Sequence, residues 1–319
     1  MDGADRSGTG GEAPDLSVVI TTRNRYPELI ACIESIAKSS YAEPFELVVI
    51  DDRSGDETGG LTAAEIEERF SISHVTFFHS PESLKMVRAR NKGAELARGR
   101  LVLLVDDDNV VDPGMLSELV GCADRHADAG IVGPSMYMLH NREKYLDYQT
   151  INLFTMRTVL HVADGPAEAY ESDGIPNVFL VKREVFEKAG YFDPDLVQSF
   201  TEPDFSYNAA RHGFRTVVCP KAITYHDIDL SERGRHMGSI PAKAYCLIRN
   251  RFVIVRRYGR PHHLVVFLVF FSWVWPLAYS LIAVRDGNWR RIRYYLAGFV
   301  DGYYFALTGR FRSRPGITS

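Results

Sequence analysis

Three consecutive aspartates, Asp106, Asp107 and Asp108, end the apolar run "LVLLV" at 101–105. Adjacent carboxylates repel one another, and a divalent cation is the usual remedy. Oxygen ligands suit Mg²⁺ or Mn²⁺, which typically keeps several waters and binds a substrate diphosphate. The three aspartates therefore predict a metal ion that in turn holds a diphosphate.

Polar residues also follow two other apolar runs. "LSVVIT" at 16–21 leads through Thr21 to Arg23, and "FELVVI" at 45–50 leads to Asp52. Apolar strands that alternate with helical patterns predict an α/β fold with a parallel sheet covered on both faces. In such sheets ligands bind beyond the carboxyl ends of the strands. One acidic pair alone suits a turn or a helix cap, but three polar strand ends on one edge favour a ligand site.

The helical pattern that precedes the acidic strand carries further candidates. "MVRARNKGAELARG" at 86–99 predicts a helix that is closed by Gly99. Its residues Arg88, Arg90 and Asn91 either contact the diphosphate or donor sugar, or belong to a solvated helix face.

Composition and missing signatures exclude several classes of protein. The 319 residues are 45% hydrophobic and 24% charged, as in an ordinary globular protein, and the net charge of −4 does not favour nucleic acid as a partner. Neither a P-loop nor a GxGxxG loop follows the first strand, which argues against P-loop NTPases and ordinary dinucleotide enzymes. The four cysteines lie far apart and are expected to be reduced thiols of a cytosolic protein.

Four segments together resemble family 2 glycosyltransferases of the GT-A fold, in that family's order and spacing. They are "LSVVITTRN", "LVVIDDRSGDET", "RARNKGAELARGRLVLLVDDDN" and "KREVFEKAGYFDPDL", and the resemblance covers about 16–230. It implies a Rossmann-like, mostly parallel nucleotide-binding sheet flanked by helices. It also implies an inverting transfer of a sugar from a nucleotide-diphosphate donor, built on UDP, GDP or dTDP, to an acceptor hydroxyl.

The resemblance also assigns roles to the residues at the strand ends. The residues that match Thr21 and Asp52 bind the nucleoside in that family, and those that match the three aspartates serve ribose, donor sugar and metal. Asp106 and Asp107 are therefore expected at the donor, and Asp106 and Asp108 at Mn²⁺ or Mg²⁺.

A second acidic segment supplies the candidate base. "SFTEPDFSYNAARHG" predicts a helix opened by Pro203 and closed by Gly213, with Glu202 at its N-cap and Asp204 in its first turn. The family pattern is Glu-Asp-x-Asp, whose second residue is the general base. An alignment without gaps puts Thr201 first and Glu202 in the place of the base. Both acids otherwise suit the helix dipole, and Asp204 is the second candidate.

His226 follows the strand-like run "AITY" at 222–225. A lone histidine at a strand end is more often structural than a ligand. Similar transferases use a histidine after this strand as a metal ligand, so the resemblance implies His226 as a ligand beside the aspartates. An imidazole ligand would favour Mn²⁺ over Mg²⁺.

The C-terminal part has a different character. "LVVFLVFFSWVWPLAYSLIAV" at 264–284 carries no charge, is long enough to span a bilayer and has basic residues on both sides. A single span would send one basic flank outside, against the positive-inside tendency. The apolar segment 292–311, interrupted by Asp301, therefore predicts a helical hairpin that re-enters or spans the membrane with both ends cytoplasmic. A buried soluble helix pair, at a homodimer interface, is the alternative.

These observations predict a domain organisation and a function. We expect a disordered tail at 1–13, a catalytic domain at 14–245 whose halves, 14–135 and 136–245, bind nucleotide sugar and acceptor, and a membrane-associated helical region at 246–319. The expected activity is metal-dependent inverting glycosyl transfer at the cytoplasmic face of the membrane, to a lipid-linked or cell-surface glycan such as a polyprenyl-linked one.

Two alternatives stay open. A nucleotidyltransferase that makes nucleotide sugars would need a glycine- and arginine-rich loop after the first strand, and "TTRNRYPEL" has no glycine. A catalytically dead, membrane-associated binding module is favoured only by the missing Glu-Asp pair. Sugar turnover separates these possibilities.

Overall fold

The computed structural model describes residues 4–6, 14–163, 165, 167–228 and 241–317. The chain divides into two compact units. The first unit is Met1–Gln149, Leu160–Phe192 and Phe205–Ile228, and the second unit is Thr150–Val159, Asp193–Asp204 and Asp229–Ser319. This division differs from the boundary expected at residue 245, because that position falls inside helix α8 (Pro241–Tyr258) and the second unit also takes in two earlier segments.

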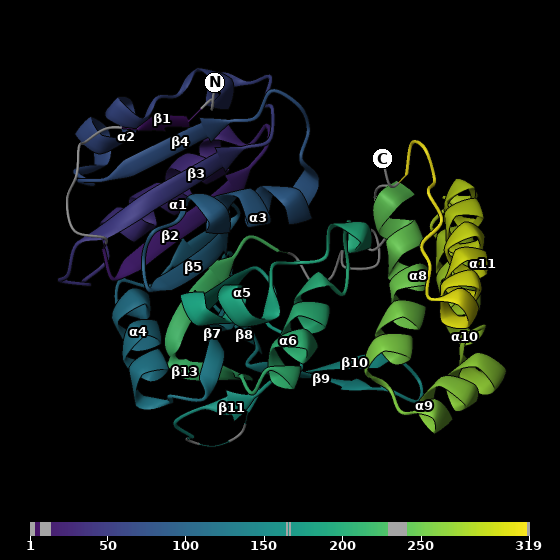
Figure 1. The fold of residues 1–319 in the computed structure, drawn as a ribbon. Helices are drawn as coiled ribbons and strands as arrows, with labels where there is room; N and C mark the ends of the chain where they lie inside the picture. Colours follow the sequence, from purple (N-terminus) through teal and green to yellow (C-terminus); the bar gives the residue numbers. More distant parts are fainter. Residues whose placement is uncertain (1–3, 7–13, 164, 166, 229–240, 318–319) are drawn as a thin grey trace. The chain divides into compact units, whose positions relative to one another are not determined.

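The first unit is built on a sheet with the strand order β1-β4-β3-β2-β5-β12-β7-β13-β11 (Figure 1). Strands β2 to β5 pair in parallel, as do β7 and β13, while β12 lies antiparallel between β5 and β7. Six strands thus end at the same edge, which confirms the mostly parallel sheet. Their bounds are β1 Ala4–Arg6, β2 Leu16–Thr22, β3 Phe45–Asp51, β4 Val75–His79, β5 Leu101–Asp106, β7 Ala129–Met138, β11 Tyr170–Glu171, β12 Val178–Lys182 and β13 Arg215–His226.

Helices cover both faces of this sheet. One core joins the sheet to α1 (Tyr26–Ala37), α2 (Ala63–Phe70) and α4 (Met115–Arg125), and a second joins it to α3 (Lys85–Leu96), α5 (Arg183–Ala189) and α6 (Thr201–Arg211). Successive residues of one strand serve different cores, since Val18 and Ile20 belong to the first and Val19 to the second. Burial on both faces explains why the strands are almost continuously apolar.

Two helix ends differ from the sequence prediction. Helix α3 ends at Leu96, so Gly99 is not its cap. Gly99 is needed for a close approach instead, because a Cβ there would lie 2.7 Å from the backbone nitrogen of Ser17. Helix α6 begins at Thr201, which puts Glu202 inside the first turn and not at the N-cap.

The sequence also makes predictions about the end of α6, the N-terminal tail and the cysteines. Gly213 has a φ of +88° just after α6, as expected for the residue that ends a helix. Within the tail expected to be disordered, β1 (Ala4–Arg6) pairs with β4, and the remaining residues of 1–13 lie outside the described part of the chain. The four cysteines are free and buried.

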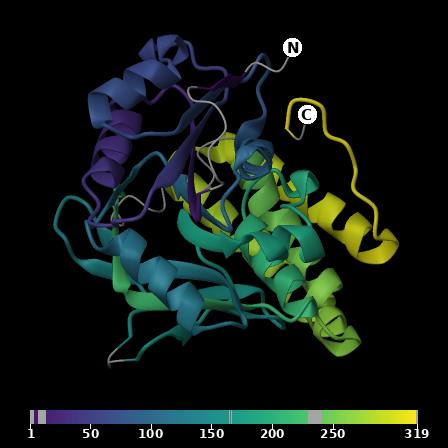
Figure 2. The same cartoon turned by 60° about the vertical axis from the view of Figure 1, so that its left-hand side comes forward.

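The second unit is mainly helical. It contains α8, α9 (Pro261–Val266), a π-helical turn (Phe267–Phe271), α10 (Val274–Arg285) and α11 (Ile292–Thr308). Helices α8 and α11 lie side by side (Figure 1 and Figure 2). Their close contact depends on Gly298, where a Cβ would lie 2.4 Å from the carbonyl oxygen of Tyr245. Within the described residues, Pro261–Arg285 is the one helix that is long and apolar enough to cross a membrane.

Candidate active site

The carboxyl edge of the first unit's sheet brings several predicted residues together. Thr21 on β2 is the register partner of Asp106 on β5. The short strand β6 (Asn109–Val111) pairs with the end of β13, so that His226 lies opposite Asn109. As a result, His226 Nε2 is 3.6 Å from Asp108 Oδ1. Parallel pairing of β2 with β5 and antiparallel pairing of β6 with β13 thus bring together residues that are far apart in sequence.

Arg25 shares one guanidinium nitrogen between two of the three aspartates. Its Nη1 lies 3.0 Å from Asp107 Oδ1 and 2.9 Å from Asp108 Oδ2, although its side chain is 47% exposed. Burial raises the pKa of Asp107 to about 6, against the opposing charge of Arg25. Burial also disfavours the charge on Asp108, but contacts with His226 and Arg25 outweigh it and lower the pKa of Asp108 to about 2. Sequence reasoning missed Arg25, although its loop already held Arg23.

Asp106 is held by a buried arginine. Arg90 Nη2 lies 2.7 and 2.8 Å from the two carboxylate oxygens of Asp106, and Arg90 is only 2% exposed. The guanidinium also packs over the ring of Phe179, at 5.8 Å from its centroid. The structure therefore places Arg90, expected at the donor diphosphate, on a carboxylate of the protein itself.

Asp52 fixes the chain that leads into α3. Its carboxylate accepts hydrogen bonds from the backbone N–H groups of Leu84 and Lys85 and from Ser83 Oγ. Arg23 Nη1 donates to the same Ser83 Oγ at 2.7 Å and lies 3.6 Å from Asp52 Oδ2. Asp52 and Arg23 are thus neighbours, joined through the start of α3.

The two remaining candidates on α3 have different surroundings. Asn91 uses both atoms of its amide on the backbone of Phe192, with distances of 2.8 and 3.1 Å. Its side chain therefore holds the chain after α5 in place. Arg88 is exposed on the same helix.

His226 is oriented through its other ring nitrogen. Tyr145 Oη lies 2.9 Å and Asn177 Nδ2 lies 3.0 Å from Nδ1, so Nε2 is the nitrogen that faces Asp108. Such contacts to the second nitrogen fix the ring of a metal-ligating histidine. Nothing in the sequence marks Tyr145 or Asn177 for this role, because both come from segments far from His226.

A cation would find two adjacent protein donors at this edge. Among the described residues, no group of three or more His, Cys, Asp or Glu side chains is arranged to hold a metal ion. Asp108 and His226 nevertheless offer a carboxylate and an imidazole 3.6 Å apart, a donor pair that suits Mn²⁺ when water and phosphate oxygens complete the shell. Asp106, the third expected ligand, is engaged by Arg90.

Glu202 and Asp204, which belong to the second unit, have different partners. Glu202 Oε2 accepts a hydrogen bond of 2.8 Å from Thr201 Oγ1. Asp204 Oδ1 accepts from Arg257 Nη1 and from Tyr258 Oη, both at 2.9 Å, within a buried site. Burial raises the pKa of Asp204, although the charge of Arg257 opposes this. Asp204 is therefore part of an ion pair inside the second unit.

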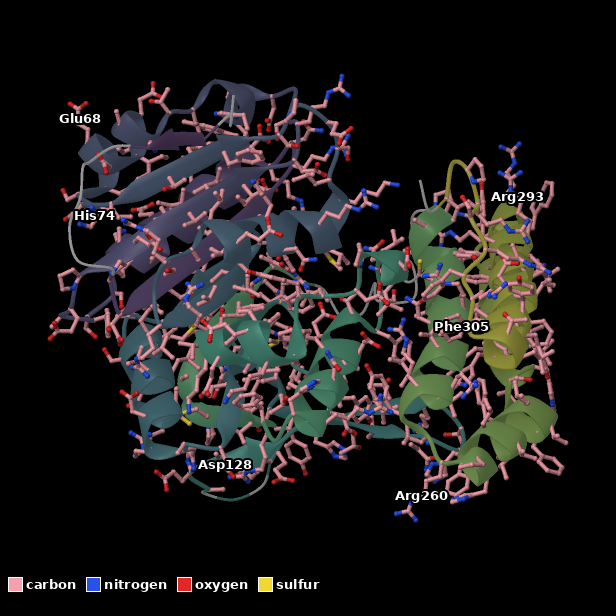
Figure 3. The ribbon with its side chains drawn as sticks, in the orientation of Figure 1. Glu68, His74, Asp128, Arg260, Arg293 and Phe305 are labelled. Atoms are coloured by element: carbon pink, nitrogen blue, oxygen red, sulfur yellow. The ribbon has the colours of Figure 1, made fainter. Side chains whose placement is uncertain are left out.

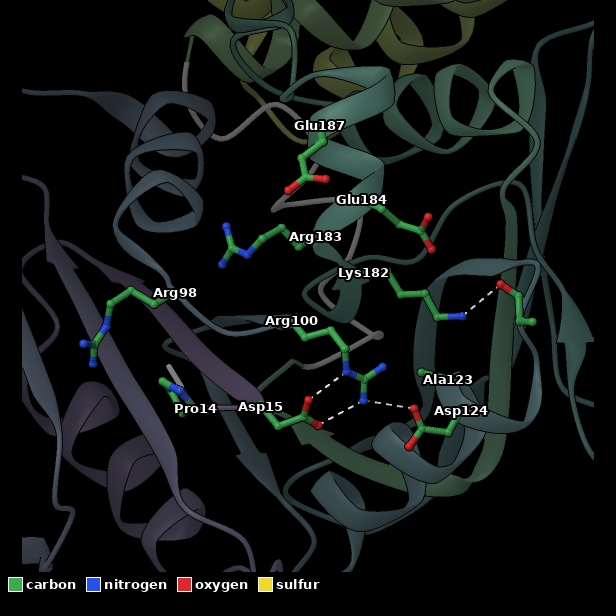
Figure 4. A pocket seen from close by; sticks show the side chains of 11 residues that line it. Pro14, Asp15, Arg98, Arg100, Ala123, Asp124, Lys182, Arg183, Glu184 and Glu187 are labelled. Atoms are coloured by element: carbon green, nitrogen blue, oxygen red, sulfur yellow. Dashed lines mark hydrogen bonds and ion pairs between the residues drawn. The ribbon is translucent and has the colours of Figure 1, made fainter. Parts of the chain in front are cut away.

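A hollow of about 800 Å³ lies at the other edge of the first unit's sheet (Figure 4). Asp15 and Arg100 there precede β2 and β5, so it lies at the amino ends of the strands. Its basic groups already have partners: Arg100 bonds to Asp15 and Asp124, and Lys182 donates to two backbone carbonyls. The carboxyl edge remains the candidate site.

The comparison with known families is decisive for the class of protein. The family described as "Glycosyl transferase family 2" matches residues 17–190, which is more than half of the chain. The chain belongs to glycosyltransferase family 2. It is a glycosyltransferase, which confirms the resemblance and sets aside the nucleotidyltransferase alternative.

Individual relatives of this glycosyltransferase share 16% to 31% sequence identity with it. The Bacillus subtilis (strain 168) glycosyltransferase YwdF is 26% identical over 213 residues, covering 65% of this chain and 73% of the relative. A glucosyl-dolichyl phosphate glucuronosyltransferase of Haloferax volcanii is 31% identical over 121 residues, 37% of each chain. The mannosyltransferase of Pyrobaculum calidifontis, solved with GDP-Man and Mn²⁺, gives a TM-score of 0.56 at 16% identity and covers 94% of this chain and 88% of that one. At that identity the likeness shows the GT-A fold.

Proposed function

We propose that this glycosyltransferase moves a sugar from a nucleoside-diphosphate sugar to an acceptor hydroxyl, with inversion at the anomeric carbon. The observation that carries the proposal is the group of Asp106, Asp107, Asp108 and His226 at the carboxyl edge of the sheet. Open α/β sheets bind their ligands at that edge. Thr21 and Asp52, from neighbouring strand ends, are proposed on the nucleoside side, with UDP, GDP or dTDP as the carrier.

Asp108 and His226 are the residues that would hold a divalent cation. A cation there would neutralise the charge that develops on the nucleoside-diphosphate leaving group, a contribution of several kcal/mol. Asp106 orients the donor, and Arg90 holds its carboxylate for that task. The Mn²⁺ bound together with GDP-Man in the Pyrobaculum calidifontis mannosyltransferase supports this assignment.

Glu202 is proposed as the general base. A general base must take a proton from the acceptor, and the two acids of the α6 first turn differ in their burial and in the hydrogen bonds that the structure shows. Asp204 is buried and accepts hydrogen bonds from both Arg257 and Tyr258. Glu202 accepts from the neutral hydroxyl of Thr201 and is only half-buried. Its carboxylate would take the acceptor proton as the acceptor oxygen attacks.

The acceptor is proposed to be attached to a lipid, and the enzyme to work at the cytoplasmic face of the membrane. Seven large apolar side chains on Pro261–Arg285 are at least half exposed: Val265 59%, Val269 58%, Phe270 59%, Trp273 52%, Leu277 50%, Leu281 62% and Val284 60%. Five of them, from Val265 to Leu281, recur at every fourth residue, whereas Phe267 and Tyr279 between them are buried. A helix that exposes its apolar stripe suits a lipid surface.

Basic residues lie at both ends of this apolar helical run. Arg260 and Arg285 bound the helical run, and Arg293 is exposed on α11. Figure 3 shows Arg260 and Arg293 at the two ends of the helical region. Basic groups at both ends favour a run that lies in the membrane surface with both ends on one side, because a single span would put one of them outside. The dolichyl phosphate named for the Haloferax volcanii relative supports a polyprenyl-linked acceptor.

A donor screen tests the reaction. Purified full-length protein is incubated with UDP-, GDP- and dTDP-sugars, with and without Mn²⁺, and release of the nucleoside diphosphate is measured. The expected result is metal-dependent release from one class of donor that rises when polyprenyl-linked glycans are added. Release that is equally fast in EDTA contradicts the metal role, and no release from any donor contradicts the transfer itself.

A vesicle experiment tests the membrane face. The protein is floated with vesicles of phosphatidylcholine, with or without phosphatidylglycerol. We expect binding to the anionic vesicles that Val269→Glu weakens and that Val162→Glu, a matched change at a 48% exposed valine of the first unit, leaves intact. If Val269→Glu instead dissociates a homodimer in light scattering and vesicles do not bind, the face is a dimer interface.

A further inference from the structure

The segment that leads into Glu202 has an unusual backbone. Val197 has φ 61° and ψ −53°, and the Gln198 N–H donates to the Leu196 carbonyl at 2.6 Å, which defines a γ-turn of the rare, strained kind. Ser199 and Phe200 follow, each with φ 62°. A β-branched valine in this region is an outlier, and such a strained residue persists only where the surrounding structure holds it in place.

One amide of α8 imposes much of this conformation. Asn250 Nδ2 donates to the carbonyl oxygens of Leu196 at 3.0 Å, Gln198 at 2.8 Å and Ser199 at 2.7 Å. An amide nitrogen has only two hydrogens, so at least one is shared between two carbonyls. Its Oδ1 accepts from Arg249 Nε at 2.9 Å, which fixes the orientation of the amide.

The neighbours of Asn250 on α8 also contact the segment 195–200. Arg249 Nη2 donates to the carbonyl of Asp195 at 2.6 Å, and the guanidinium of Arg251 lies 5.0 Å from the centre of the Phe200 ring. All three α8 residues, Arg249, Asn250 and Arg251, are buried, with exposed fractions of 1%, 0% and 4%. Two arginines and an asparagine are costly to bury, and the contacts with this segment offset that cost.

Apolar contacts hold the same turn from its side chains. Leu196 is fully buried in a cluster with Val253 and Phe305, and Val197 packs with Tyr245 and Cys246. The helices of the second unit thus contact the backbone and the side chains of the segment. The Asp204 N–H then donates to the Phe200 carbonyl at 3.0 Å, which starts the first turn of α6.

We infer that Asn250, supported by Arg249 and Arg251, is a positioning residue for the general base. It holds the strained turn at 196–200 so that Thr201 and Glu202 enter α6 in one fixed orientation. The inference rests on the proposed function, because Glu202 is assigned as the base there. The C-terminal helices would then have a role in catalysis besides membrane binding, because α8 would fix the orientation of Glu202.

Asn250→Asp is the sharpest single change, because it keeps the shape and removes the N–H donors. The activity measured is nucleoside-diphosphate release from the best of the UDP-, GDP- and dTDP-sugars with water as acceptor. We expect kcat to fall roughly 100-fold, as a displaced catalytic group does, while KM for the donor changes by less than about twofold. Tyr303→Phe is the matched control, since it removes a 2.6 Å bond to the Leu268 carbonyl in the same helical unit without touching the segment.

Hydrogen exchange gives a readout that does not depend on turnover. In Asn250→Asp, the amides of 196–204 should exchange faster while those of β5 stay unchanged. A double-mutant cycle with Glu202→Gln then tests the route of the effect, because Asn250→Asp should cost little kcat once the base is gone. An additive effect in the cycle, or faster exchange with normal kcat, overturns the positioning role. A wild-type protein that releases no nucleoside diphosphate from any donor overturns the proposed function instead, while the exchange data still report on the turn.

Discussion

The first and second units both bury carboxylates, but they supply them with positive charge in different ways. In the first unit, Asp107 and Asp108 share a single nitrogen of Arg25, and that arginine is half exposed. In the second unit, Asp301 has an arginine of its own, since Arg314 donates through Nε at 2.7 Å and Nη2 at 3.0 Å. The phenol of Tyr245 adds a third bond to Asp301 at 2.9 Å.

This difference distinguishes carboxylates that stabilise the fold from carboxylates that can bind a further cation. A carboxylate whose oxygens already accept from its own guanidinium and a phenol has little capacity for another cation. Adjacent carboxylates that share one partly solvated guanidinium keep uncompensated charge, which a metal ion or a cationic partner can neutralise. Asp301 is of the first kind, and Asp107 and Asp108 are of the second.

Removal of Asp108 should have the largest effect on activity. We expect Asp108→Ala to lower turnover by about 1,000-fold, since a Lewis-acid contribution of several kcal/mol depends on it, and to leave the melting temperature almost unchanged. EDTA should have a comparable effect on the wild type. Asp112→Ala is the matched control, because the Asp112 carboxylate accepts a local bond from Gly114 N at 3.0 Å and is no part of the proposed site. A variant that keeps metal-dependent turnover would remove Asp108 from the site.

The two acids of the α6 first turn should separate activity from stability. We expect Glu202→Gln to lower turnover at least about 100-fold with unchanged affinity for nucleoside diphosphate and Mn²⁺, because the base acts on the acceptor. Asp204→Asn should lose less turnover but more stability, because it weakens the ion pair with Arg257. Turnover and urea unfolding are measured on both variants. The reverse pattern of turnover would make Asp204 the base.

Several features of this comparison could be predicted from the sequence. The polar ends of β2, β3 and β5 stand out because each follows an apolar run, and parallel pairing brings them to one edge. The place of His226 beside Asp108 came only from the family resemblance. The pairing of Asp204 with Arg257 spans 53 residues, and no local pattern encodes it.

The unpredicted features share one physical cause, which is partners distant in sequence. The strained turn at Val197 carries no glycine or other local signal, because its stability comes from Asn250 and the apolar contacts of α8. Gly99 resembles a helix end in the sequence, yet its role is a close approach to Ser17, which only the pairing of β2 and β5 creates. Glu202 was expected at the N-cap but lies in the first turn for a similar reason. The segment 196–200, which α8 contacts, precedes a helix that begins at Thr201.

Asp301 should behave as a structural acid. We expect Asp301→Asn to lower the free energy of unfolding by about 2 kcal/mol at neutral pH, the usual worth of a charged hydrogen bond. Contacts with Arg314 and Tyr245 outweigh burial and lower the pKa of Asp301 in the folded protein. Its contribution is therefore present above the unfolded pKa of about 4 and is lost as the pH falls below it. Urea unfolding between neutral and acid pH checks this, and a constant difference from the wild type would contradict it.

Substitution of Arg25 should have the smallest effect of these changes, and the effect is on Mn²⁺ affinity. The Arg25 guanidinium lies 3.0 Å from Asp107 and 2.9 Å from Asp108, so it competes with any cation that the same carboxylates bind. Half-exposed ion pairs are worth at most about 1 kcal/mol, so we expect Arg25→Ala to strengthen Mn²⁺ binding by up to about fivefold in the absence of nucleotide. Titration of free Mn²⁺ by electron paramagnetic resonance measures this directly. Arg23→Ala is the control, because Arg23 lies beside Asp52 and Ser83. Weaker Mn²⁺ binding in Arg25→Ala alone would mean that Arg25 holds the two carboxylates in the geometry that the cation requires, and the shared charge would then be part of the site.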